Sequence, residues 1–78
     1  MRDLINAGSG AYINKNKIIG FTDAKGNSIM RLIKIKEEEN KVLDYRRGKT
    51  AKTIIYLDDG FIVLSTVTVE TLKNRYEE

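Results

Sequence analysis

The chain has 78 residues, which is enough for one domain, and it contains neither cysteine nor histidine. These absences exclude disulfides, the usual zinc sites and catalytic pairs built on cysteine or histidine. The net charge of +3 is too small to imply a nucleic-acid partner by itself. Because a single core of this size is marginal, we expect the protein to form a homo-oligomer.

The sequence carries no sign of a membrane or export segment. No apolar run approaches the roughly 18–20 residues that span a bilayer. The opening MRDLINAGSG lacks the apolar region of a signal peptide. We therefore expect a cytoplasmic protein without a membrane partner.

The first predicted elements are two strands. An apolar stretch precedes Gly8-Ser9-Gly10, and this pattern favours either a bend within an edge strand or a flexible turn. The run Ile18-Ile19-Gly20-Phe21-Thr22 is short, β-branched and aromatic, so it predicts the second strand. Residues 23–27 predict a turn after it.

A helix of about three turns is predicted from residue 28 onward. Ile29, Leu32 and Ile33 share one helical face, with Lys36 next along it. We expect Ser28 or Asn27 to cap the helix by accepting a backbone N–H hydrogen bond. On the opposite face, Lys34 and Glu38 are four residues apart and form a solvent-exposed pair of opposite charge.

A hairpin is the clearest element of the second half. Residues 53–57 and 61–64 are two β-rich runs joined by Asp58-Asp59-Gly60, a strong turn signal. The paired aspartates also suit magnesium, although the turn explains both of them. Residues 42–44 predict a further short strand, and Thr68 predicts the cap of a final helix over 69–76. The order β-β-α-β-β-β-α predicts a small α+β domain.

The triplet Gly48-Lys49-Thr50 resembles the end of a nucleotide-binding P-loop. That loop requires a glycine five residues earlier and a helix immediately after it. Leu43 occupies the glycine position, and a β-rich run follows the triplet. The sequence therefore argues against a nucleotide loop, and without an activated nucleophile or a paired-carboxylate site we predict no enzymatic activity.

Two clusters of basic residues remain. Arg46, Arg47, Lys49 and Lys52 follow Tyr45 with only Asp44 as a close acid, and Lys15 and Lys17 lie between the two early strands. Such loops can neutralise phosphates and release counterions, which gives salt-dependent affinity for nucleic acid. An ordinary solvated basic surface is the alternative.

Five short segments occur along the chain in a characteristic order. They are Asn6 with Gly8 and Gly10, Asn16-Lys17-Ile18-Ile19, Asp44 through Lys52, Val63-Leu64-Ser65, and Glu70-Thr71-Leu72 with Arg75. In this order and spacing they resemble the RemA/RemB family of small bacterial regulators of extracellular-matrix genes, from Ile5 to Arg75.

The resemblance implies a DNA-binding transcription regulator that works as a ring-shaped homo-oligomer, with a fold similar to the LytTR type. The DNA-contacting arginines of the family would fall on Lys17, Lys49, Thr50 and Lys52. Lysine retains the attraction to phosphate but lacks the bidentate fork that reads guanine, and threonine carries no charge. Arg46 and Arg47 are hypothesised to compensate.

Binding of double-stranded DNA is thus the leading hypothesis. A protein-interaction or scaffold oligomer is one alternative, in which the bases only keep the protein soluble. An RNA-binding module is another, disfavoured by an aromatic content of 8%, because single-stranded RNA is usually recognised by stacking on aromatic rings. No cofactor, metal or small-molecule substrate is expected.

Overall fold

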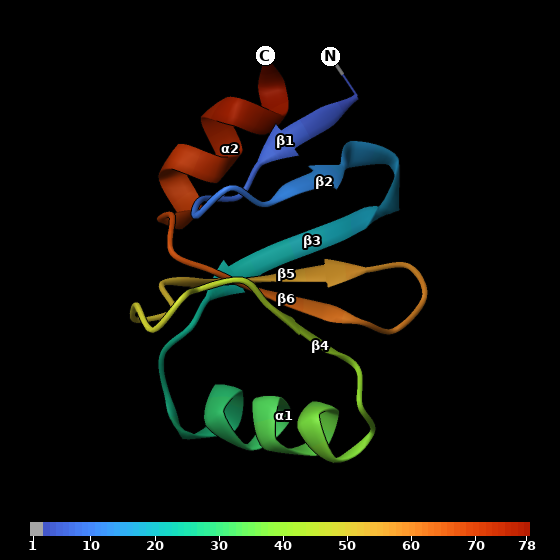
Figure 1. The fold of residues 1–78 in the computed structure, drawn as a ribbon, viewed down its shortest axis with the longest axis vertical. Coiled ribbons are helices and arrows are strands. Elements are labelled where there is room, and N and C mark those ends of the chain that lie inside the picture. The colour runs from blue at the N-terminus through green and yellow to red at the C-terminus, as the bar shows by residue number, and fades with distance from the viewer. Residues whose placement is uncertain (1–2) are drawn as a thin grey trace.

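The computed structural model describes residues 3–78, which form two β-sheets and two α-helices (Figure 1). The prediction of a small α+β domain is confirmed. The elements are β1 (Leu4–Asn6), β2 (Tyr12–Asn14), a 3₁₀ turn (Lys15–Lys17), β3 (Ile18–Asp23), α1 (Asn27–Glu38), β4 (Val42–Asp44), β5 (Thr53–Leu57), β6 (Ile62–Ser65) and α2 (Val69–Glu77). Neither helix is long and apolar enough to cross a membrane within the part of the chain that the structure describes.

The central sheet has four strands in the order β3-β5-β6-β4. β5 pairs antiparallel with both β3 and β6, and β4 runs parallel to β6. The predicted hairpin is confirmed: β5 has the predicted bounds, and after residues 58–60 turn the chain, β6 begins and ends one residue later than predicted. In this turn the Asp59 carboxylate accepts a hydrogen bond from the Phe61 amide at 3.1 Å, the local bond typical of aspartate in turns.

The sheet is covered on both faces, so the molecule has three layers (Figure 1). Successive residues of β5 point to opposite faces. Ile55 and Leu57 join the core beneath β1, β2 and α2, whereas Ile54 packs on the side of α1. Two polar side chains, Thr53 and Ser65, are buried, and their hydroxyls donate to backbone carbonyls at 2.6 and 2.8 Å, which offsets the cost of burying them.

The N-terminal segment corrects the predicted strand order, because it forms two strands where one was expected. β1 and β2 pair antiparallel in a separate sheet, so the full order is β-β-β-α-β-β-β-α. Gly8-Ser9-Gly10 is a tight turn and not a bend within one strand: the Ala11 amide donates to the Gly8 carbonyl at 2.9 Å. Ser9 and Gly10 have φ values of 53° and 81°, as in a type I′ hairpin turn. We call this the 8–11 turn.

Helix α1 begins one residue earlier than predicted and is not capped by a side chain. Gly26 precedes its first turn, and Asn27 and Ser28 both lie inside the helix, so the predicted caps are wrong. The Lys36 ammonium donates to the Gly60 carbonyl at 2.9 Å and so ties α1 to the β5–β6 turn. No residue of α1 is buried, and Met30 and Ile35 are 58% and 51% exposed.

Helix α2 follows the prediction closely. Thr68 caps it, its hydroxyl accepting a hydrogen bond from the Thr71 amide at 3.3 Å. Leu72 is completely buried against the β1–β2 hairpin side of the core. The Arg75 guanidinium donates to the Asn6 carbonyl at 2.7 Å, which fixes α2 to the end of β1.

Candidate nucleic-acid interface

The basic loop, residues 45–52, connects β4 to β5 and is fixed at its exit by main-chain hydrogen bonds. The Lys52 amide donates to the Ser65 carbonyl at 2.8 Å, and its carbonyl accepts from the Ala24 amide at 3.1 Å. Lys52 is therefore held between the ends of β3 and β6 although its side chain is exposed. Lys49 and Thr50 are exposed as well. The loop presents two lysines to solvent, and the backbone of Lys52 is fixed at the strand junction.

A second tight turn shapes the loop. The Lys49 amide donates to the Arg46 carbonyl at 3.1 Å, and the two residues between them, Arg47 and Gly48, have φ values of 54° and 83°. These are again the angles of a type I′ turn, which we call the 46–49 turn. Gly48 lets the chain bend here, because glycine adopts a positive φ without strain.

Arg46 is neutralised within the loop. Its guanidinium holds the Asp44 carboxylate through two bonds, Nε to Oδ1 at 2.9 Å and Nη2 to Oδ2 at 2.8 Å, and its amide adds a third at 3.1 Å. The side-chain bonds to Arg46 lower the pKa of Asp44 from 3.8 to about 2, and the same bonds raise the pKa of Arg46. Arg46 thus organises the loop and adds little net charge to its surface.

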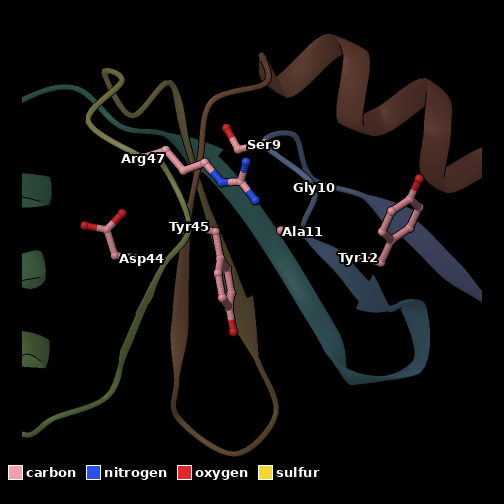
Figure 2. A pocket seen from close by; sticks show the side chains of 7 residues that line it. All are labelled: Ser9, Gly10, Ala11, Tyr12, Asp44, Tyr45 and Arg47. Carbon is pink, nitrogen blue, oxygen red and sulfur yellow. The ribbon is translucent and has the colours of Figure 1, made fainter.

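Arg47 has a different environment from its neighbour. Its guanidinium reaches back toward the 8–11 turn, near Ser9 and Gly10, while Asp44 points away from it (Figure 2). Within residues 3–78, Arg47 has no hydrogen bond or ion pair. It is exposed, so its guanidinium faces solvent.

Lys17 lies at the other end of the sheet. Its carbonyl accepts a hydrogen bond from the Asp58 amide at 2.8 Å, which places it beside the β5–β6 turn. Lys52 immediately precedes β5, so the five residues of that strand, roughly 15 Å, separate the two lysines. The neighbouring Lys15 is engaged with α2: its ammonium donates to the Glu78 carbonyl at 3.2 Å and lies 5.8 Å from the centre of the Tyr76 ring. One subunit therefore does not bring the two predicted basic clusters together.

The structure adds one basic residue that sequence reasoning missed. Lys25 lines a shallow hollow together with Thr50 and Lys52. Antiparallel pairing of Asp23 with Thr53 brings the segment after β3 beside the end of the basic loop. The pairing of β3 with β5 is the signal that would have placed Lys25 beside the basic loop. The local sequence around Lys25 predicts only a turn.

The fold and the loop together define a small α+β domain that displays basic side chains at one end of its central sheet. The chain belongs to the RemA-like family, described as extracellular matrix regulatory protein A-like, whose profile matches residues 4–76. The resemblance noted in the sequence is thereby confirmed.

Relatives match nearly the whole chain. A protein of Coprothermobacter proteolyticus is 36% identical over 74 residues, covering 95% of this chain and 70% of that protein. One of Oceanobacillus iheyensis is 33% identical over 72 residues, covering 92% and 84%. One of Bacillus cytotoxicus is 31% identical over 71 residues, covering 91% and 82%. All three are named "putative regulatory protein".

Proposed function

We propose that the protein is a DNA-binding transcriptional regulator that acts as a homo-oligomeric ring with a LytTR-like subunit. The observation that carries this proposal is the position of Lys49 and Lys52, exposed on a loop anchored to the sheet, in a chain of the RemA-like family. Thr50 lies between them and offers a hydroxyl to a phosphate. Lys17 and Arg47 complete the proposed contact set. Arg46 contributes by binding Asp44, which organises the loop.

Phosphate attraction supplies most of the affinity in this mechanism. Lysine ammonium groups neutralise backbone phosphates without reading base edges. Arg47 is the one arginine of the loop with an uncommitted planar fork, which suits bidentate binding of a phosphate or a guanine edge. Selectivity then depends on Arg47 and on the shape of the duplex.

The proposed ring would strengthen this mode of binding. A single subunit separates Lys17 from Lys52 along β5, whereas a ring repeats both clusters at regular intervals. Weak contacts from several subunits act together because each bound loop raises the effective concentration of the next. The exposed Met30 and Ile35 of α1 offer apolar area for subunit contacts.

The proposal is tested by replacing Lys49 and Lys52 together with glutamate. We expect duplex affinity to fall by at least about 100-fold at roughly 0.15 M salt, with a shallower dependence of affinity on salt. Fluorescence anisotropy with labelled duplex measures the affinity, and sedimentation measures the oligomer. The matched control is Lys73→Glu, an exposed lysine of α2 outside the proposed α1 contact surface, compared with Lys49→Glu alone so that the net charge changes equally.

Three results would contradict the proposal. Undiminished duplex binding by an intact oligomer of the Lys49/Lys52 variant would show that the loop is not the contact surface. An equal loss in the control would indicate general charge attraction. Retention of single-stranded RNA in preference to duplex DNA across a salt gradient would favour the RNA-binding alternative.

A further inference from the structure

A hollow of about 460 Å³ lies between the 8–11 turn and the first residues of the basic loop (Figure 2). This volume falls within the range of small-molecule sites. The lining residues come from two segments far apart in the chain: Ser9, Gly10, Ala11, Tyr12, Asp44, Tyr45 and Arg47. The hollow therefore exists only in the folded subunit.

The hollow carries one uncompensated positive charge. The Arg47 guanidinium extends over it, and its Nη2 atom would lie 3.5 Å from a Cβ placed on Gly10. Among the described residues, the one acid that lines the hollow is Asp44, which has both carboxylate oxygens bonded to Arg46 and points away from Arg47. An anion entering the hollow would thus meet a free guanidinium fork without a competing carboxylate.

The 8–11 turn, whose Ser9 and Gly10 line the hollow, adds neutral donors beside the guanidinium. Its hydrogen bonds use the amides of Ala7 and Ala11, and the central amides of Ser9 and Gly10 donate to no backbone carbonyl within residues 3–78. Within the same residues, the Ser9 hydroxyl has a single long contact, 3.4 Å, with the Thr66 hydroxyl. Two adjacent amides, a hydroxyl and a guanidinium are the donor set that binds a phosphate group.

An aromatic surface adjoins this donor set. The Tyr45 ring extends below Arg47 in Figure 2 and is 45% exposed. Tyr45 belongs to neither core cluster, so packing of the core does not explain an aromatic ring at this position. An exposed ring beside an anion site suits a nucleobase, because any of the bases can stack on tyrosine.

We propose that this hollow binds a free 5′-mononucleotide, with the phosphate on Arg47 and Ser9 and the base against Tyr45. The nucleotide site itself does not depend on the proposed function, but its effect on DNA binding rests on that function. Because Arg47 is also proposed to contact DNA, a bound nucleotide competes with DNA for the same guanidinium. The cellular concentration of nucleotides would then change the affinity of the basic loop for DNA.

Saturation-transfer NMR on the 78-residue chain tests the site without DNA, with adenosine 5′-monophosphate and adenosine as separate probes and inorganic phosphate added as a competitor of the monophosphate. We expect the monophosphate to bind more tightly than either part, with the strongest transfer to the base protons. Arg47→Asn should weaken monophosphate binding at least about ten-fold and leave adenosine unchanged. Asparagine tolerates the positive φ of this position, which keeps the turn intact.

Matched variants separate the site from general attraction. Tyr45→Leu should weaken both the monophosphate and adenosine about five-fold, whereas Tyr45→Phe, which keeps the ring, should stay within about two-fold of the parent. Lys49→Gln removes the same charge as Arg47→Asn from the same loop but does not line the hollow, so it should retain monophosphate binding within about two-fold.

The proposal is overturned if the parent shows no transfer at millimolar monophosphate, or if Lys49→Gln and Arg47→Asn lose binding equally. It is also overturned if single-stranded DNA gives the Tyr45-dependent signal and the free nucleotide gives none. In anisotropy titrations, the monophosphate should weaken duplex binding by the parent and not by Arg47→Asn. Absence of any duplex binding would refute the proposed function and leave the nucleotide site standing on the NMR result.

Discussion

The layer made of β1, β2 and α2 buries Ile5, Ala7 and Leu72 almost completely, whereas α1 on the other face of the sheet contributes no buried residue. The first layer is also tied by specific polar contacts, such as those from Arg75 to β1 and from Ser65 to Ala7. The α1 layer keeps Met30 and Ile35 in solvent. The comparison indicates that the β1–β2–α2 layer contributes more buried side chains to the core than α1 does, and that α1 leaves apolar surface exposed.

Leu72→Ala should produce the largest loss of stability. It removes a completely buried side chain from the β1–β2–α2 layer and leaves a cavity, so we expect a loss of about 3 kcal/mol in the free energy of unfolding. Ile33→Ala on the half-buried face of α1 should cost only about 1 kcal/mol. Urea unfolding at one fixed protein concentration measures both. Equal losses would show that the layers do not differ, and Leu72→Val serves where the alanine variant fails to fold.

Gly8→Ala should rank second, at about 2 kcal/mol. A Cβ on Gly8 would lie 2.5 Å from the Thr66 hydroxyl oxygen and 2.8 Å from a Val67 methyl, and its φ of 89° disfavours any side chain. The matched control is Gly20→Ala, because no atom lies within 4 Å of a Cβ there. Thermal unfolding of the two variants checks the contrast. A tolerated alanine at position 8 would mean that the 8–11 turn is not held closely against the end of β6.

The Asp44–Arg46 pair should have a smaller, pH-dependent effect. The pKa of Asp44 is lower in the folded protein, about 2, than its ordinary value of 3.8, so the pair stabilises the fold fully above about pH 4. That stability is lost as the pH falls from 4 through 2. Because the Asp44 side chain is 44% exposed, solvent screening limits the contribution to about 1 kcal/mol or less.

Asp44→Asn checks this expectation by unfolding at pH 6 and at pH 3. The variant should be less stable than the parent at the higher pH, and the difference should shrink at the lower pH as the parent carboxylate begins to be protonated. A difference that grows toward low pH would contradict the assigned sign. The basic loop should also become more flexible in the variant, since Arg46 loses its charged partner.

Ile35→Ser should have the smallest effect on the subunit. Its side chain is 51% exposed on α1, so we expect a change within about 0.5 kcal/mol in the free energy of unfolding. Self-association should weaken by at least about ten-fold if α1 lies in the subunit interface. Sedimentation across a dilution series measures this. Unchanged association would place the interface elsewhere on the molecule.

Local signals in the sequence were sufficient for half of the fold. The β5–β6 hairpin and the Thr68 cap depend on neighbouring residues, so pattern and turn chemistry predicted them. The β1–β2 hairpin was missed because strands of three residues contain too little alternation to distinguish them from loops. Its position also depends on Gly8 packing against Thr66, a contact between distant parts of the chain.

The charge of the candidate interface was visible in the sequence, but its geometry was not. Arg46 and Arg47 look equivalent as neighbours in a basic run. The left-handed backbone at Arg47 turns the two side chains apart, so that one meets Asp44 and the other faces the 8–11 turn. The backbone conformation of the 46–49 turn causes this difference, and the residue types of Arg46 and Arg47 alone do not predict it.

The main-chain hydrogen bonds of Lys52 have a consequence for hydrogen exchange and for the entropy of binding. Its amide is bonded to Ser65 and its carbonyl to Ala24, so this amide should exchange with solvent as slowly as those of the central strands. Its side chain is nevertheless exposed and forms no ion pair within residues 3–78. A ligand that binds Lys52 therefore orders only a side chain, because the backbone that carries it is already fixed by folding.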